Sequence, residues 1–347
     1  MSELACPIPI RDDLPPRVTL AQGGGGTAMH ALIGEILSTL GVEGVAEMHD
    51  GAVLDVPASR VAFTTDSYVV NPLFFPGGDI GSLAVYGTVN DLAMCGAEPA
   101  WLSMGLVLEE GLPMEDLRKV LASMARASRE TGVRVVTGDT KVVESGKADG
   151  IFVNTAGIGM VREGVRIAPS RIRSGDRIVL SGDIGRHGMA ILAARGGLRL
   201  RSALESDLAP LWRAVSLVLG CGAEVHCLRD LTRGGLASAL NELSTVSGLG
   251  FRVEEESIPV SSEVRGLCEL LGLDPMHVAC EGRFVAFVSG ADAGEALKAL
   301  GDCPEGCGAT VIGVVGDHSE PGVVLSSPLG TERFMEMLSG EQLPRIC

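Results

Sequence analysis

Apolar residues recur along the first half of the chain at two different spacings. Between residues 29 and 40 they fall three and four apart, which predicts an amphipathic helix with Thr27 as its N-cap. Helices are also expected at 79–94 and from Pro113 onward, since proline suits a first helical turn. Strands are expected at 60–65, 101–108, 133–137 and 151–158.

The second half of the chain mixes both spacings again. Helical periodicity is found at 187–195, 207–220, 233–247, 262–271, 291–300 and 329–338. Strand-like runs are found at 177–181, 251–254, 284–289, 310–315 and 322–326. The alternation lacks the strict βαβ rhythm of a doubly wound sheet, so the pattern predicts α+β domains.

The length of the chain, 347 residues, suits two domains better than one. A stretch without apolar periodicity, VREGVRIAPSRIRSGD, places the expected boundary near residue 170. The predicted organisation is a lead at 1–22, an N-terminal domain at 23–170, a C-terminal domain at 171–338 and a mobile tail at 339–347.

Composition and charge narrow the class of protein. Hydrophobic residues make up 46% of the chain, which indicates a globular rather than a disordered protein. The 28 basic and 44 acidic residues give a net charge of −16, so no nucleic-acid binding is expected. No apolar run approaches the about 18 residues of a membrane span, and the start of the chain does not match a signal peptide, so we expect a cytoplasmic protein without membrane contact.

The chain contains nine cysteines, an odd number that favours free thiols over a disulfide framework. One of them, Cys347, is the last residue. A thiol at the end of a flexible tail can enter a pocket and withdraw, which suits a tethered nucleophile or a substrate carrier. The alternative is that the residue has no role, since every chain must end in some residue.

A run of four glycines precedes the first predicted helix. The chain has neither the G-x-x-x-x-G-K-[ST] loop nor a G-x-G-x-x-G motif between a strand and a helix, so a bound nucleotide would need another device. Backbone N–H groups in such a run, at the start of a capped helix, favour anions. A flexible linker explains the glycines equally well. The residues are Gly23, Gly24, Gly25 and Gly26.

Four acidic residues stand in polar contexts that follow apolar segments, and we expect them at the ends of strands. They are Asp66 in FTTDS, Asp91 in GTVNDLA, Asp139 in VTGDTK and Asp230 in RDLTRGG. Mg²⁺ is usually bound by one or two carboxylates together with phosphate oxygens, so the group suggests a metal and nucleotide site. Turn and cap chemistry explains each residue taken alone. Lys141 could neutralise a phosphate or move a proton, or be a solvated surface charge.

Taken together, these segments resemble the HypE family of hydrogenase maturation factors, the carbamoyl dehydratases. The resemblance covers nearly the whole chain, from about Gly23 to Cys347. Its most specific element is the terminal PRIC, because related enzymes share the acidic motifs without this tail. It is carried by FTTDSYVVNPLFFPGGDIGSLAVYGTVNDLAMCGAEP, VLEEGLPMEDL, VTGDTKVV, RDLTRGGL, VRGLCELLGLD and PRIC.

The resemblance implies the two-domain α+β fold of the aminoimidazole-ribonucleotide-synthetase (PurM-like) superfamily, in which N-terminal domains pair their sheets in a homodimer. It implies ATP-dependent conversion of a carbamoyl group on the C-terminal thiol into a thiocyanate, which supplies cyanide for [NiFe]-hydrogenases. The implied cofactors are ATP and Mg²⁺. The implied partners are the carbamoyltransferase HypF and the HypC–HypD complex.

The resemblance also assigns roles to residues. It implies that Cys347 carries the substrate and that Lys141 and Glu281, the latter in HVACEGR, transfer protons. A turn would explain Glu281 without the resemblance. The implied metal ligands are Asp66, Asp91 and Asp230, and the implied nucleotide-binding residues are Gly23, Gly24, Gly25, Gly26, Asp66, Asp91 and Asp139.

Two alternatives remain from the sequence. Another ATP-using enzyme of the superfamily, of the selenophosphate or thiamine-phosphate type, would share the acidic motifs but not the terminal cysteine. A selenophosphate synthetase is further expected to have a reactive cysteine in the glycine loop, and AQGGGGTAM has none. A non-catalytic thiol carrier would keep the tail, but its acids would be structural and it would bind no ATP.

Overall fold

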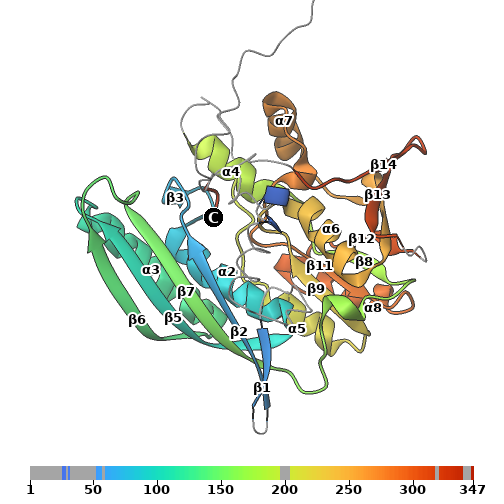
Figure 1. The fold of residues 1–347 in the computed structure, drawn as a ribbon, viewed down its shortest axis with the longest axis horizontal. Coiled ribbons are helices and arrows are strands. Elements are labelled where there is room, and N and C mark those ends of the chain that lie inside the picture. The colour runs from blue at the N-terminus through green and yellow to red at the C-terminus, as the bar shows by residue number, and fades with distance from the viewer. Residues whose placement is uncertain are drawn as a thin grey trace, which may run out of the picture.

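The computed structural model describes residues 26–28, 30–31, 52–56, 59–195, 204–316, 320–338 and 345–347. The chain forms two halves, each built around its own sheet (Figure 1). Most of the helix predicted at 29–40, together with Gly23, Gly24 and Gly25, lies outside the described residues.

The first half contains a five-stranded sheet. Neighbouring strands are antiparallel except β5 and β6, which are parallel. Two helices, α2 (Ile80–Met94) and α3 (Met114–Thr131), lie on one face of it (Figure 1). A small hairpin of β3 (Phe74–Phe75) and β4 (Gly78–Asp79) precedes α2. In sheet order, the strands are β1 (Ala52–Val56), β2 (Ser59–Tyr68), β7 (Ile151–Val161), β5 (Ala97–Glu109) and β6 (Arg134–Val143).

The second half contains a seven-stranded sheet with helices on both faces. Its strands, in sheet order, are β14 (Glu332–Phe334), β13 (Gly322–Ser326), β10 (Gly250–Glu254), β12 (Thr310–Val315), β8 (Arg177–Leu180), β11 (Phe284–Val288) and β9 (Val225–Asp230). Its helices are α4 (Arg186–Ala194), α5 (Trp212–Gly220), α6 (Gly235–Ser247), α7 (Ser262–Leu271) and α8 (Ala293–Gly301).

Strand β11 shows how this sheet is covered on both faces. Val285 and Phe287 belong to the apolar cluster that contains α6, whereas Ala286 and Val288 belong to the cluster that contains α5 and α8. Because successive side chains of a strand point to opposite faces, a five-residue run that is apolar throughout is buried on both sides.

Helix α2 joins the two halves. Nearly all of its residues are buried, because it packs on β2, β5 and β7 on one side and on β9 and α5 on the other. Asp79 begins the helix with a capping box, in which its side chain accepts hydrogen bonds from the Gly81 and Ser82 backbone. A helix that is apolar all round is thereby explained by its place between two layers.

The sequence predicts most elements correctly, and the two-domain α+β fold is confirmed. The helix predicted at 329–338 is wrong, since the chain forms strand β14 there, and the helix predicted at 207–220 begins only at Trp212. Strand β6 extends to Val143, six residues beyond its predicted end at 137. None of the helices in the described ranges has the length and apolar character needed to cross a bilayer.

Candidate active site around the C-terminal thiol

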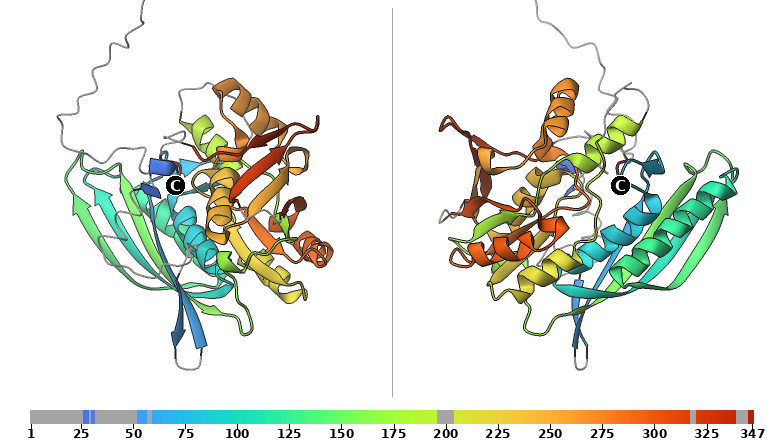
Figure 2. Two further views of the ribbon diagram at one scale, coloured as in Figure 1. Left: turned by 45° about the vertical axis from the view of Figure 1, so that its right-hand side comes forward. Right: turned by 180° about the vertical axis from the view of Figure 1, so that it is seen from behind.

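The last three residues lie beside the segment that follows β2, at Val69 and Asn71. Val69 N–H donates to the terminal Cys347 oxygen at 3.1 Å, and Asn71 N–H donates to the Arg345 carbonyl at 3.2 Å. The C-terminus therefore lies between the first sheet and the second half of the chain, as Figures 1 and 2 show. The mobility predicted for the tail stays a prediction.

The thiol of Cys347 lies among charged groups from both halves of the chain. The residue is partly buried and packs against the apolar cluster that contains Tyr68. Burial raises the pKa of the thiol to about 12, with a lowering effect from Arg233 and raising effects from Glu281, Asp66 and Asp230, in that order. In this position the thiol is protonated at neutral pH and three carboxyl groups are within electrostatic reach of it.

Glu281 is the most deeply buried of these carboxyl groups. It is 3% exposed, and its Oε1 has no hydrogen-bond partner within the part of the chain that the structure describes. Its backbone is held on both sides, since its N–H donates to Asp207 Oδ1 at 2.8 Å and its carbonyl accepts from Asn90 Nδ2 at 3.3 Å. Gly282 is required beside it, because a Cβ there would lie 1.8 Å from the Asp207 carbonyl oxygen.

The environment of Glu281 favours its neutral form. Burial raises its pKa well above the usual value, and the charges of Asp230, Asp66 and Asp207 raise it further, while Arg233 lowers it. A buried carboxyl group with a raised pKa and a free oxygen is the type of group that serves as a base near neutral pH.

Three of the four predicted acids come together here. Asp66, within β2, has its pKa raised by burial and lowered by Arg233. Asp230 ends β9 and is buried. The prediction that Asp91 ends a strand is wrong, because the residue lies in α2, where its Oδ2 accepts a 2.8 Å hydrogen bond from Thr64. The contact between α2 and β2 places Asp91 beside the strand that carries Asp66.

The fourth acid, Asp139, is separated from the others by the sheet. It does not end a strand as predicted but lies in the middle of β6, level with Ser67 across the sheet. Because successive side chains of a strand point to opposite faces, Ser67 and Asp139 lie on the face of the sheet opposite to that of Asp66. Lys141 is on the same outer face, where it forms a 2.8 Å ion pair with Asp139 that lowers the pKa of that carboxyl.

A cavity of about 300 Å³ lies beside this outer pair of charges. Asp139 and Lys141 line it together with Val69, the residue that binds the terminal Cys347 oxygen. The outer pair is thus near the tail but not among the groups around Glu281. Of the glycine run, Gly26 is described: it is buried, and the next residue, Thr27, donates its N–H to the Leu338 carbonyl at 3.2 Å.

Two residues at the site were missed by the sequence predictions. Arg233 is exposed. The charge of Cys347 has the largest effect and raises its pKa, desolvation lowers the pKa, and further charges raise it again, those of Asp66, Glu281 and Asp91. It follows Asp230 within the quoted segment RDLTRGG, so the motif contained the signal. His187, whose ring binds the Ile346 carbonyl, had no signal beyond its residue type.

The acids fit a magnesium ion only if other ligands contribute. No group of three or more His, Cys, Asp or Glu side chains in the described ranges is arranged to hold a metal ion alone. Mg²⁺ is commonly held by one or two carboxylates, with phosphate oxygens and water completing its shell. The clustered acids and the unpaired Glu281 oxygen agree with such a shared site.

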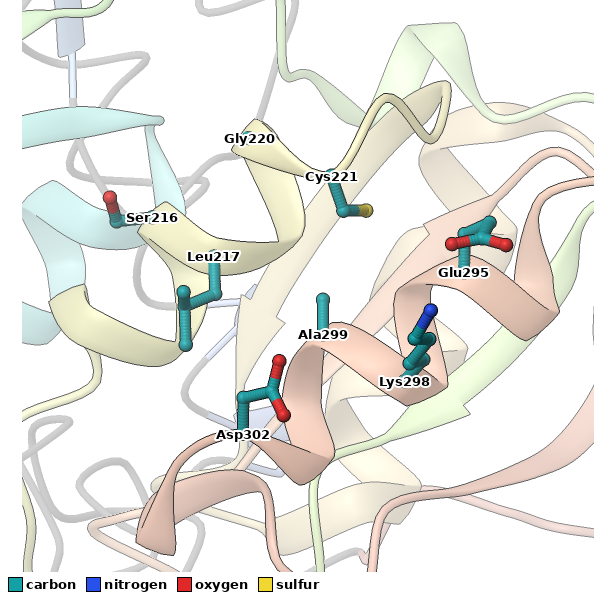
Figure 3. A pocket seen from close by; sticks show the side chains of 8 residues that line it. All are labelled: Ser216, Leu217, Gly220, Cys221, Glu295, Lys298, Ala299 and Asp302. Carbon is teal, nitrogen blue, oxygen red and sulfur yellow. The ribbon is translucent and has the colours of Figure 1, made fainter.

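A second cavity, of about 340 Å³, lies between α5 and α8, away from the thiol. Figure 3 shows Cys221 from the end of α5 beside Glu295 and Lys298 from α8. None of the residues predicted from the sequence lines this cavity, so it does not compete with the site around Cys347.

The fold and the site define a two-domain protein of the AIR synthase related class. The family description for its N-terminal domain matches residues 48–161, and that for its C-terminal domain matches residues 173–326. Within this class the chain belongs to the HypE family of carbamoyl dehydratases. It is 50% identical over 343 residues to the carbamoyl dehydratase HypE of Rhodobacter capsulatus, which covers 97% of this chain and 99% of that protein.

Solved structures agree with this assignment. A structure of HypE in complex with ATP has a TM-score of 0.80 and 45% identity, and the match covers 95% of this chain and 100% of that one. A chain of a HypE–HypF complex has a TM-score of 0.84 and 42% identity, and the match covers 89% of this chain and 100% of that one. The recognition made from the motifs and the terminal PRIC is confirmed.

Proposed function

We propose that this protein is an ATP-dependent carbamoyl dehydratase that acts on a carbamoyl group carried by its own Cys347. The observation that carries the proposal is the position of the Cys347 thiol among Glu281, Asp66, Asp230 and Arg233. The names of its relatives support the activity, and the relative solved with ATP supports the use of that nucleotide. The product is a thiocyanate, which supplies cyanide for hydrogenase maturation.

The reaction removes one water from the carbamoyl group in total. When bound, ATP supplies the γ-phosphoryl group that lets the amide oxygen leave as phosphate, and Mg²⁺ spreads the charge on that group. The amide nitrogen loses two protons, one as its oxygen is phosphorylated and one as phosphate leaves and the C≡N bond forms. Glu281, buried beside the thiol, takes the second of them. Arg233 places a positive charge at the same site, where negative charge develops on the departing oxygen.

The remaining predicted residues are candidates for binding the metal ion, binding the nucleotide or transferring a proton. Asp66, Asp91 and Asp230 are the candidates for Mg²⁺, because they lie on the same side of the first sheet as the thiol. Gly23, Gly24, Gly25, Gly26 and Asp139 stay candidates for nucleotide binding. Lys141 stays a candidate for proton transfer through the cavity that it shares with Val69.

The proposal is tested by the mass of the C-terminal peptide. The protein is first carbamoylated on Cys347 and then mixed with Mg-ATP, and we expect the peptide to lose one water. A carbamoyl group that stays intact while ATP is bound would contradict the dehydratase. Retention of the group without any ATP binding would instead support the non-catalytic carrier.

The partners follow from the same chemistry. HypF, which is found in complex with a HypE relative, is proposed as the carbamoyltransferase that loads Cys347. The HypC–HypD complex is proposed as the acceptor of the cyanide. We also propose a cytoplasmic location, in agreement with the eight cysteines of the described residues, all of which are free thiols.

A homodimer is proposed through the face of the first sheet on which none of the described helices packs. Phe63, Ile158 and Trp101 are neighbours across β2, β7 and β5, and their shared face is opposite to the one on which α2 packs. Phe63 is 44% exposed and Trp101 is 37% exposed. A row of large apolar side chains open to water is typical of an interaction surface, and the resemblance to the family indicates a second copy as its partner.

We expect Trp101→Glu to give a monomer, because a carboxylate would then be buried against an apolar face. Light scattering coupled to size-exclusion chromatography measures the mass. Leu329→Glu is the control, since Leu329 is 92% exposed but lies outside this sheet. A monomeric wild-type protein, or a Trp101→Glu variant that remains dimeric, would show that this face is not the interface.

A further inference from the structure

His187 connects the second half of the chain to the C-terminal tail. It is the second residue of α4 and is completely buried. Its Nε2 lies 2.7 Å from the carbonyl oxygen of Ile346, and its Nδ1 lies 2.8 Å from Ser206 Oγ. The edge of its ring packs against Phe75 in a T-shaped contact, with 5.5 Å between the ring centroids. The ring is thereby held on three sides.

The hydrogen bonds define the state of the ring. A carbonyl oxygen only accepts, so Nε2 must donate to Ile346. Nδ1 then accepts from the Ser206 hydroxyl, which in turn accepts from the Leu208 N–H at 3.0 Å. Burial lowers the pKa of His187 to about 4, so the neutral ring required by this pattern is the form present at neutral pH. Both ring nitrogens of His187 are therefore hydrogen-bonded, one to Ser206 and one to Ile346.

We propose that His187 is a positioning residue that holds the tail so that the Cys347 thiol remains in the active site. It binds the carbonyl of the residue next to the cysteine, whereas the segment just after β2 binds the carbonyl oxygens of Arg345 and Cys347. The tail is thus held from both halves of the chain. His187 does not act on the reacting atoms, and its importance for turnover rests on the proposed function.

The contact joins an internal helix to the last peptide bond of the chain, 159 residues away in sequence. Ile346 is 5% exposed and packs into the same apolar cluster as α4 residue Met189, so release of the tail would expose the Ile346 side chain. A histidine that only filled the core could donate its N–H to any nearby acceptor, whereas His187 donates to the carbonyl next to the C-terminal residue. This pairing points to recognition of the docked tail.

The test measures how often the tail leaves the site, without using the dehydratase reaction. In the docked position the raised pKa of the Cys347 thiol makes alkylation by iodoacetamide slow, so the rate reports the released fraction. His187→Asn keeps an amide near the Nδ1 position but cannot reach Ile346. Loss of that one hydrogen bond is expected to raise the alkylation rate of Cys347 about fivefold at neutral pH.

A matched variant separates the hydrogen bond from the packing. His187→Gln keeps a donor near the Nε2 position and is expected to restore slow alkylation. Alkylation of Cys227 and Cys303, followed by mass spectrometry on the same samples, reports on unfolding, since both are buried thiols in apolar clusters that do not contain the tail. Equal rates in the wild type and His187→Asn, or equally fast rates in His187→Asn and His187→Gln, would overturn the proposal.

A second position keeps the proposal testable if His187→Asn does not fold. Ser206→Ala removes the donor to Nδ1 and leaves the ring free to exchange its proton between the two nitrogens. We expect faster alkylation of Cys347 than in the wild type, with unchanged slow rates at the buried Cys227 and Cys303. An unchanged rate at Cys347 in this variant would also overturn the proposal.

Discussion

Replacement of Cys347 by alanine is expected to abolish formation of the thiocyanate while ATP binding remains unchanged. The thiol is the atom on which the carbamoyl group is built, so no substrate can form without it. The tail itself should still bind, because its contacts with Val69, Asn71 and His187 use the main chain rather than the cysteine side chain. Mass spectrometry of the C-terminal peptide and calorimetric titration with Mg-ATP measure the two properties.

The matched control for this prediction is Cys307→Ala. Cys307 is an exposed free thiol that lies outside the site, so its loss should leave the product unchanged. Thiocyanate formed by the Cys347→Ala protein would mean that another residue carries the substrate. Loss of ATP binding in that variant would mean that the tail is part of the nucleotide site.

Glu281→Gln is expected to slow dehydration by a factor of about 10² to 10⁴, the usual contribution of a positioned base. Glutamine has nearly the same shape, and the contacts of this residue with Asp207 and Asn90 use its backbone. The fold and ATP binding should therefore be kept. A single-turnover measurement on the carbamoylated protein gives the rate, and Glu263→Gln, on the exposed start of α7, is the control.

The pH dependence distinguishes a base from a structural acid. A base acts in its deprotonated form, and burial raises the pKa of Glu281. The wild-type rate should therefore increase with pH through the raised pKa of this group, and Glu281→Gln should lose that increase. Wild-type turnover in the glutamine variant, or an unaltered pH profile, would remove Glu281 from the mechanism.

The sequence predicted which residues belong to the candidate site better than it predicted the secondary structure in which they lie. Asp66, Asp230 and Glu281 were recognised from motifs, and the fold brings them together with the last residue of the chain. Arg233 was overlooked although it stands in the same segment as Asp230. His187 could not be found from the sequence, because its role depends on a partner 159 residues away.

The errors in local structure have different physical causes. Phe334 was assigned to a helix from its apolar spacing, but its backbone pairs with Val324 of β13, and this distant partner decides the conformation. Asp91 was expected at a strand end although it lies within the helix predicted at 79–94, and the structure places it in that helix. Asp139 was expected near Asp66, but a strand longer than predicted placed its side chain on the opposite face.

Because main-chain atoms dock the tail, we expect the position of the thiol to depend on the number of residues in the tail. The N–H groups of Val69 and Asn71 are two residues apart, and they meet carbonyl oxygens that are also two residues apart, at Cys347 and Arg345. One residue added before the cysteine would shift the thiol by about 3.3 Å along the segment after β2 and turn it to the other face. We therefore expect the site to favour a tail of one length, with the side chains of Arg345 and Ile346 adding contacts to those of the main chain.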